Sequence, residues 1–310
     1  MDNRAEVREF LVSRRAKISP EQAGLPAGSG GRRVPGLRRS EVAVLADVSV
    51  EYYSKLERGF LAGVSAGVLD AVARALLLDE AERAHLFDLA RAADGSSALE
   101  RPRRRVAKQW QTRPSLQWAL DAIADGPAFV RNGRMDLLAA NRLGRAFYDE
   151  AYADPQRPAN LARFAFLDRA AYRFYRDWDQ AADVTVAILR TEAGRNPHDK
   201  DLQDLVGELS TLSEEFRRRW GAHDVRRHGT GAKSFNHHVV GALTLAYEGL
   251  EMVAEPGLTL TIYTAEPGSP SEQALRLLAS WAAATQDAQA TEGVAGDGGG
   301  GTAVDRGVNP

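Results

Sequence analysis

Hydrophobic residues recur at helical spacing along most of the first 93 residues. Val7, Phe10 and Leu11 begin the pattern, which stops near Ser19-Pro20 because a residue that precedes proline avoids helical geometry. A Gly- and Pro-containing loop, residues 24–36, follows. Ser and Asp residues suited to N-capping precede two of the later periodic stretches, and Gly59 is suited to end one. We therefore predict five helices, over about residues 4–19, 37–47, 49–59, 65–77 and 79–92.

The second half of the chain mixes helical and strand periods. Two apolar runs flank Asn132-Gly133, a pair typical of a two-residue hairpin turn with positive φ at both positions. Alternating apolar residues predict strands at 243–247 and 258–262, with Leu258, Leu260 and Ile262 on one face. We predict helices over about 141–151, 168–193 (one long amphipathic helix), 199–221 (one helix or a pair) and 270–285.

Polar segments divide the chain. Residues 94–114 are basic and contain prolines, which is typical of a linker, and residues 286–310 contain GDGGGG without periodicity. We predict an all-α five-helix helix-turn-helix domain at 1–93, a linker at 94–114, an α+β domain with an antiparallel sheet at 115–285 and a disordered tail at 286–310.

Composition narrows the class of protein. The 310 residues are 44% hydrophobic, which argues against wholesale disorder, and they include no cysteine. The lack of cysteine excludes a disulfide scaffold, a thiolate-bound metal and a thiol nucleophile. No long apolar run predicts a membrane span, and the first residues have no apolar signal core, so we expect a cytoplasmic protein.

Charge is divided unevenly between the two halves. The net charge is −2, but residues 1–113 carry 20 basic and 15 acidic side chains, whereas residues 114–310 carry 20 basic and 27 acidic ones. A basic part joined to an acidic part indicates two modules, with polyanion binding in the first.

Residues 37–59 have the pattern of a helix, a tight turn and a second helix. Val42 and Ala46 face inward on the first helix, and Val48 fills the turn. Tyr53 and Leu56 form the inner face of the second helix, which leaves it a polar outer face. A helix held at the surface in this way can enter the DNA major groove.

This segment resembles the helix-turn-helix of the XRE family, the lambda-repressor and Cro-like group, over residues 4–92. Three segments resemble the MmyB-like regulators of actinomycetes. They are GLPAG…GRRVPGLRRSEVAVLADVSVEYYSKLERG, WGAHDVRRHGTGAKSFNHHVVGALTLAYEGL and IYTAEPGSPSEQALRLLA. The sequence departs from these patterns at Asp47, where the turn usually has glycine, and at His238, where the second family usually has proline. The resemblance implies a PAS-like C-terminal domain whose pocket holds a fatty acid or a similar apolar ligand.

The resemblance also implies roles for individual residues. Val50, Glu51 and Lys55 match positions that face base edges, where Lys55 would donate to guanine and Glu51 would accept from cytosine. Arg32 and Arg33, in the loop, are candidates for the minor groove or the backbone. The complete predicted DNA-binding set is Arg38, Arg39, Ser49, Val50, Glu51, Tyr52, Ser54, Lys55 and Arg58.

In the C-terminal domain, apolar residues from several elements have two interpretations. They belong simply to the hydrophobic core, or they line a closed ligand cavity of several hundred Å³. The family resemblance motivates the second interpretation. These residues are Phe129, Leu137, Leu138, Phe147, Phe174, Trp178, Leu245 and Ile262.

Histidines cluster between residues 223 and 238, but the spacing does not favour a metal site. Adjacent histidines on a strand point to opposite faces, so His237 and His238 would not both bind one ion without a bulge. No HExxH, GxSxG, P-loop or dinucleotide glycine pattern occurs. We expect no metal, no cofactor other than a fatty acid held as ligand, and no enzymatic activity.

The sequence thus predicts a DNA-binding regulator that senses a small apolar ligand and reads double-stranded operator DNA as a homodimer, without a membrane partner. In the alternative, the C-terminal domain serves only for dimerisation or partner docking. An enzyme with an accessory helical head is a third reading, for which no catalytic spacing is found.

Overall fold

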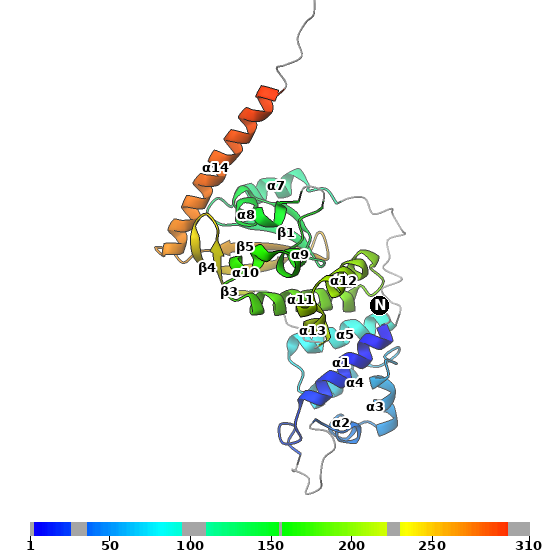
Figure 1. Ribbon diagram of the computed structural model, residues 1–310. Coiled ribbons are helices and arrows are strands. Elements are labelled where there is room, and N and C mark those ends of the chain that lie inside the picture. Colours follow the sequence, from blue (N-terminus) through cyan, green and yellow to red (C-terminus); the bar gives the residue numbers. More distant parts are fainter. Residues whose placement is uncertain (1–2, 26–35, 95–109, 155–156, 222–229, 297–310) are drawn as a thin grey trace, which may run out of the picture.

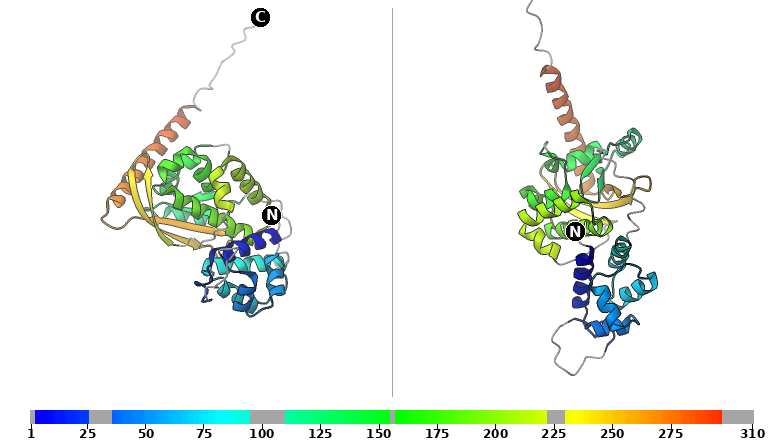
Figure 2. Two further views of the ribbon diagram at one scale, coloured as in Figure 1. Left: turned by 60° about the horizontal axis from the view of Figure 1, so that its bottom comes forward. Right: turned by 90° about the vertical axis from the view of Figure 1, so that its right-hand side faces the viewer.

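The computed structural model describes residues 3–25, 36–94, 110–154, 157–221 and 230–296. They form two lobes, a helical head (residues 3–94) and a larger α+β domain (residues 110–296), named the sensor domain below after the role that the sequence predicts for it (Figures 1 and 2). Arg32, Arg33 and most of the predicted linker lie outside the described residues.

The head contains the five helices that the sequence predicts, packed around one apolar core. Ser49 and Asp79 are N-caps, as expected, because their side chains accept hydrogen bonds from backbone N–H groups three residues on. The turn residue Asp47 has a φ of 51°, so it adopts the left-handed conformation at the position where glycine is usual. The helices are α1 (Asn3–Lys17), α2 (Arg39–Leu45), α3 (Val50–Glu57), α4 (Ala66–Ala75) and α5 (Glu80–Ala93).

The sensor domain is built on a five-stranded antiparallel sheet with the order β2-β1-β5-β4-β3. The strands at 243–247 and 258–262 are present within longer strands, and β3 is an additional strand that the sequence patterns did not predict. The strands are β1 (Ala128–Asn132), β2 (Leu137–Ala140), β3 (Thr230–His237), β4 (Gly241–Glu251) and β5 (Leu258–Thr264).

Helices cover both faces of the sheet, and each face has its own core. The larger core, rich in aromatic rings, lies on the face covered by most of the helices, and the smaller one lies under α7 (Figure 1). The helical elements are α7 (Pro114–Asp121), α8 (Arg142–Phe147), a 3-10 helix (Asp149–Tyr152), α9 (Leu161–Leu167), α10 (Arg169–Phe174), α11 (Trp178–Arg195), α12 (Lys200–Leu212), α13 (Glu214–Gly221) and α14 (Pro270–Gly296).

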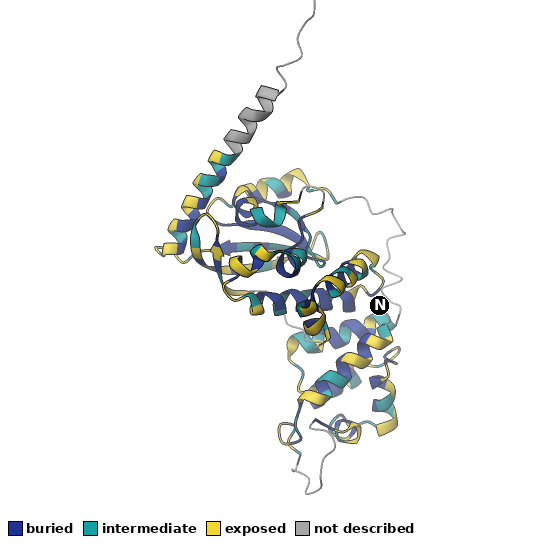
Figure 3. Ribbon diagram, in the orientation of Figure 1, coloured by how far each residue is buried: buried dark blue, intermediate teal, exposed yellow. Residues whose placement is uncertain are grey.

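Helix α11 packs in the core of the sensor domain and also contacts the head. None of its residues from Ala181 to Gly194 is exposed; Figure 3 colours the chain by burial in the orientation of Figure 1. Ala182 and Leu189 pack into the large core, whereas Gly194 lies against the His85 ring of α5. A Cβ at Gly194 would lie 2.6 Å from His85 Cε1, so this close approach of the two helices requires glycine.

Buried and half-buried ion pairs also join the head to α11. Arg190 pairs with Glu6 of α1, and it donates a second hydrogen bond to the carbonyl of Trp220. Arg195 Nε lies 3.1 Å from Asp88 Oδ2 of α5. The head therefore contacts the sensor domain directly, in addition to its covalent connection through residues 94–114.

The predicted Asn-Gly hairpin turn is wrong in detail. Four residues, 133–136, connect β1 to β2, and the residue with positive φ is Met135 (67°). Asn132 stabilises this longer turn, because its side-chain oxygen accepts from the Asp136 N–H at 3.0 Å. The turn is therefore stabilised by a hydrogen bond between a side chain and the backbone, and it does not have the two consecutive positive φ angles of a two-residue turn.

The predicted single helix at 168–193 is interrupted, which corrects that expectation. Helix α10 ends at Phe174, and α11 begins after Asp177, whose side chain accepts from the Gln180 N–H. Between them Tyr175 bridges to Phe235 of β3, and the Arg176 N–H donates to the Ser234 carbonyl. Pairing with the sheet therefore outweighs the helical period of this segment.

The last helix is longer than predicted. We expected it to end at residue 285 and the chain to be disordered from 286, but α14 continues to Gly296 and projects away from the body (Figure 2). The rest of the predicted tail lies outside the described residues. In the part of the chain that the structure describes, no helix is both long and apolar enough to cross a membrane.

Candidate DNA-recognition surface and interdomain cavity

Helix α3 is held on the head by its inner face. Tyr53 and Leu56 are buried in the core of the head, together with Val42, Ala43 and Ala46 of the first helix of the motif and its turn. The Ser49 hydroxyl accepts from the Tyr52 N–H at 3.0 Å, which fixes the start of α3. The motif therefore has the packed geometry that the sequence predicts for helix-turn-helix segments.

The predicted base-reading residues share the outer face of α3. Val50, Glu51, Lys55 and Arg58 are exposed, while Tyr52 and Ser54 are half-buried. Arg58 Nε donates to the Ser54 carbonyl at 3.2 Å, which holds its guanidinium along the helix. Helices α2 and α3 lie on the side of the head away from the sensor domain (Figure 1), so this face is open to a large ligand.

Arg39 has a structural partner that the sequence patterns did not reveal. Its guanidinium pairs with the Glu57 carboxylate, which is only 1% exposed and also accepts from Arg15 Nε at 2.7 Å. The hydrogen bond to Glu57 raises the pKa of Arg39 above its ordinary value. Glu57 thus ties α1, α2 and α3 together, and Arg39 serves this junction. Arg38, beside it, is exposed.

The apolar residues predicted to line one ligand pocket do not lie together. Phe129, Leu137, Phe147, Phe174 and Leu245 share the large core, where Phe147 and Phe174 are in edge contact at 5.3 Å. Ile262 lies on the opposite face of the sheet with the core under α7. Trp178 is at the edge of the large core, and Leu138 is half-buried outside both. Most of this set is therefore close-packed core.

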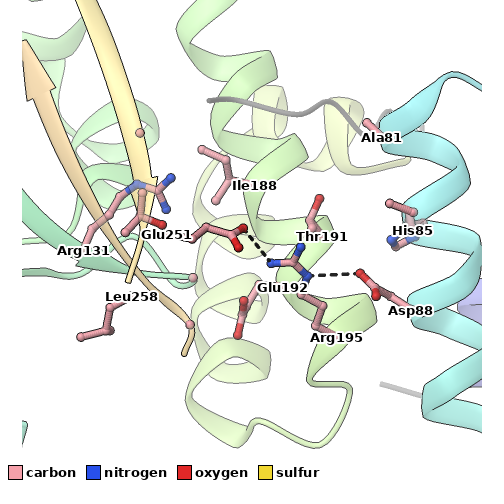
Figure 4. Close-up of a pocket in the computed structure, with 15 residues that line it drawn as sticks. Ala81, His85, Asp88, Arg131, Ile188, Thr191, Glu192, Arg195, Glu251 and Leu258 are labelled. Carbon is pink, nitrogen blue, oxygen red and sulfur yellow. Dashed lines mark hydrogen bonds and ion pairs between the residues drawn. The ribbon is translucent and has the colours of Figure 1, made fainter. Parts of the chain in front are cut away.

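A polar cavity of about 470 Å³ lies between the head and the sensor domain. Figure 4 shows α5 on one side of it and the sheet with α11 on the other. The Arg195–Asp88 ion pair crosses it, and Arg195 Nη1 also lies 3.8 Å from Glu251. The lining comprises Ala81, Ala84, His85 and Asp88 from α5, Ile188, Thr191, Glu192 and Arg195 from α11, and Arg131, Gly133, Gly249, Glu251, Gly257, Leu258 and Thr259 from the sheet and its turns.

Arg131 is the unusual member of this lining. Its side chain follows Phe129 on the inner face of β1 and is only 8% exposed. Nη1 donates to the Asn132 carbonyl at 3.3 Å, but among the described residues no carboxylate lies within ion-pair distance of the guanidinium. Burial lowers the pKa of Arg131 below its ordinary value, since burying a charge is unfavourable, and the nearby charge of Glu192 offsets part of this effect.

The neighbours of Arg131 act on its pKa in addition to burial, and Glu192 raises it. Burial lowers the pKa of Lys233 to about 8, with repulsion from Arg131 as a further cause, and its Nζ lies 5.0 Å from the centre of the Tyr247 ring. Tyr148 and Tyr263 share a hydrogen bond of 3.2 Å, and burial raises both of their pKa values. Burial raises the pKa of Glu192.

The two adjacent histidines lie together, contrary to the prediction. Their rings stack at 4.7 Å because His237 is the last residue of β3 and the chain turns directly after it. With Asp149 they form a group whose ligand atoms lie within 4.8 Å of one another. However, His237 Nε2 bonds the Ala146 carbonyl at 3.1 Å and Nδ1 accepts from the Val239 N–H. Both nitrogens of His237 are thus engaged by the backbone, and this arrangement stabilises the turn.

The family comparisons agree with the two-lobed structure. Residues 112–278 match the model of the MmyB-like transcription regulator ligand binding domain, which is more than half of the chain. The chain belongs to this family. Residues 12–86 match a helix-turn-helix domain model, which covers α2 and α3. No curated protein matches the chain. Neither matched family is described as an enzyme.

The MmyB-like domain thus carries a cavity that the sequence patterns did not reveal. The sequence contained a sign that Arg131 is unusual. Arg131 follows Phe129 by two residues, so both side chains point to the same inward face of the strand, where a charged residue is unexpected. The contribution of α5 to the cavity carried no such signal, since contact between two domains leaves no periodicity.

Proposed function

We propose that this protein is a sequence-specific transcriptional regulator that reads operator DNA with α3. The main support for this proposal is the exposed face of α3. Buried Tyr53 and Leu56 hold this helix on the head, within a segment that matches a helix-turn-helix domain model. A single helix-turn-helix buries little surface, so we further propose a homodimer that reads half-sites about 34 Å apart.

The DNA-binding part is tested by binding-site selection with the full chain, followed by shift assays on the selected site. Lys55→Ala should weaken binding by about 1–3 kcal/mol and relax the preference at one base pair. Arg58→Ala should weaken binding to all sequences and lower the salt slope by about one. Arg74→Ala, an exposed arginine at the end of α4, is the matched control and should bind normally. Normal binding by both α3 variants would refute the assignment of α3.

We further propose that the C-terminal domain binds a small organic ligand and that occupancy alters DNA binding. The family match supports ligand binding as such, and a fatty acid is the class that the sequence resemblance implies. The direct contacts of α11 with α1 and α5 supply a route from the sensor domain to the head. Extraction of the purified protein, together with thermal shifts on adding C12–C18 acids, tests the class of ligand.

The filled aromatic core favours a second function, in which the C-terminal domain only dimerises or docks a partner. Phe147, Phe174 and Phe235 pack against one another and leave little space among them. DNA affinity that does not change with any ligand, in a protein that remains dimeric, would support this alternative.

A further inference from the structure

Lys233 lies on the inner face of the sheet, where a charged side chain is unexpected. Side chains of β3 alternate between the two faces, so Lys233 shares the inner face with Phe235, which is fully buried. The register places Lys233 opposite Leu245 of β4, which is also fully buried. Lys233 itself is half-buried on an edge strand, and it does not line the interdomain cavity. A small molecule can therefore reach this amine, which lies outside the cavity that would hold a larger one.

The contacts of Lys233 do not include a counter-charge. Its Nζ lies 5.0 Å from the centre of the Tyr247 ring, and the Tyr263 ring follows that of Tyr247 at 6.1 Å. The charge that acts on this amine is that of Arg131, which is a second cation. Glu192 acts on Arg131 but is not among the groups that act on Lys233. The inner face of the sheet thus holds two cations that repel each other across two aromatic rings.

This environment makes the amine of Lys233 more nucleophilic than that of an ordinary surface lysine. Burial, with repulsion from Arg131, lowers its pKa to about 8. At pH 7.5 about a quarter of the molecules then carry the neutral amine, against about one in a thousand for a lysine whose pKa is 10.5. Only the neutral amine has the lone pair that attacks an electrophile. Desolvation beside another cation is one of the ways in which proteins activate a lysine.

The second cation favours an electrophile whose product is an anion. Carbon dioxide is small and uncharged, and it converts an amine into a carbamate. The lone pair of Nζ forms a bond to the carbon of carbon dioxide, one C–O π pair moves onto oxygen, and the nitrogen loses a proton to water. The face then holds a carbamate and Arg131 in place of two cations, so attraction replaces repulsion. An aldehyde would form an imine, which carries no negative charge for Arg131 to stabilise.

We propose that Lys233 is a modification site at which dissolved carbon dioxide forms a reversible carbamate, and that Arg131 stabilises this carbamate. The proposal goes beyond the functions proposed above, and it rests on neither the apolar ligand nor DNA binding. It assigns a chemical role to a lysine that the packing of the sheet does not require.

The experiment uses the full chain at pH 7.5, equilibrated with carbon-13-labelled bicarbonate and carbon dioxide or kept in buffer free of both. Carbamates are trapped by ethylation with a triethyloxonium salt, and peptides are mapped by mass spectrometry. We expect a labelled ethoxycarbonyl group on Lys233, in an amount that rises with dissolved carbon dioxide. Lys200, an exposed lysine on α12, is the internal control and should carry about tenfold less or lower still. Equal modification of the two lysines, or none at Lys233, would overturn the proposal.

The pH dependence of the reaction identifies the group that titrates. At constant dissolved carbon dioxide, the initial rate of carbamate formation on Lys233 should rise up to about pH 8 and level off above it, because the neutral amine reacts. Tyr247 and Tyr263 lie beside this amine, but burial raises both of their pKa values, and Arg131 keeps its proton. A rate that continues to rise to about pH 10 would be that of an ordinary lysine and would contradict the proposal.

Arg131→Met tests the partner of the carbamate. Without this cation the amount trapped on Lys233 should fall about tenfold, while Arg169→Gln, which changes an exposed arginine on α10, should leave it as in the wild type. Dissolved carbon dioxide should also raise the Tm of the wild type but not that of Lys233→Met, a measurement that does not depend on the folding of Arg131→Met. Unchanged trapping in Arg131→Met, or an equal rise in Tm in Lys233→Met, would refute the proposal.

Discussion

Glu57 in the head and Arg131 in the sensor domain are both buried charges, but their surroundings differ. Glu57 lies between Arg15 and Arg39 and joins three helices, whereas Arg131 has a backbone carbonyl, and no carboxylate of the described residues, at hydrogen-bond distance. A buried charge that is paired with opposite charges can make the packing of its helices more specific. A buried charge without an ion-pair partner lowers the stability of the folded state. The head therefore uses its buried charge to join helices, whereas Arg131 lies in the wall of a cavity without an ion-pair partner among the described residues.

The largest expected effect comes from breaking the satisfied charge of the head. Glu57→Gln should lower the unfolding free energy of the head by about 3–5 kcal/mol, because it leaves two guanidinium groups facing a neutral amide. Hydrogen exchange of α1–α3 in the full chain measures this loss. Asp70→Asn, which removes a half-buried partner of the exposed Arg83, is the control and should cost less than about 1 kcal/mol. Equal effects of the two substitutions would contradict the structural role of Glu57.

A somewhat smaller effect is expected where the two regions meet. Glu6→Gln removes the partner of buried Arg190, which keeps its hydrogen bond to the Trp220 carbonyl and its position 4.2 Å over the Trp220 ring. We expect a cost of about 2–3 kcal/mol, seen as faster hydrogen exchange in α1 and α5 while the sheet exchanges as before. Faster exchange throughout the sensor domain would show that this pair stabilises more than the contact with the head.

The smallest of these effects is a pH dependence in the sensor domain. Burial lowers the pKa of Lys233 from 10.5 to about 8, so the folded state holds this proton less tightly than the unfolded state does. The Lys233 contribution to stability is therefore present above pH 10.5 and is lost as the pH falls towards 8. Lys233→Met should gain about 1–3 kcal/mol over the wild type at pH 7.5 and little at pH 10.5. A gain that is equal at both pH values would contradict a lowered pKa.

Prediction from the sequence succeeded where a local pattern decides the structure. The five helices of the head, the left-handed Asp47 and the caps Ser49 and Asp79 follow from residues within one or two helical turns. The outer face of α3 could be predicted for the same reason, since the inner positions Tyr53 and Leu56 define it.

Prediction failed where contacts between distant segments decide the structure. Pairing of Tyr175 with β3 interrupts a segment that has a continuous helical period. The hairpin is a local exception, because the Asn132 side chain bonds the Asp136 N–H four residues on and so stabilises a longer turn. The eight apolar residues proposed as one pocket divide between two faces of the sheet and its edge. Apolar character shows that a residue is buried but not which of two cores receives it.

The sequence by itself determined the order of the domains, the helix-turn-helix and its reading face, because periodicity and capping act over a few neighbouring residues. Only the tertiary structure decided that Arg39 serves Glu57, that His237 and His238 stack at a turn, and that α5 closes a cavity over Arg131. Such features depend on how elements pack against one another, which local periodicity does not encode, and burial then sets the electrostatic cost of each charge that they enclose.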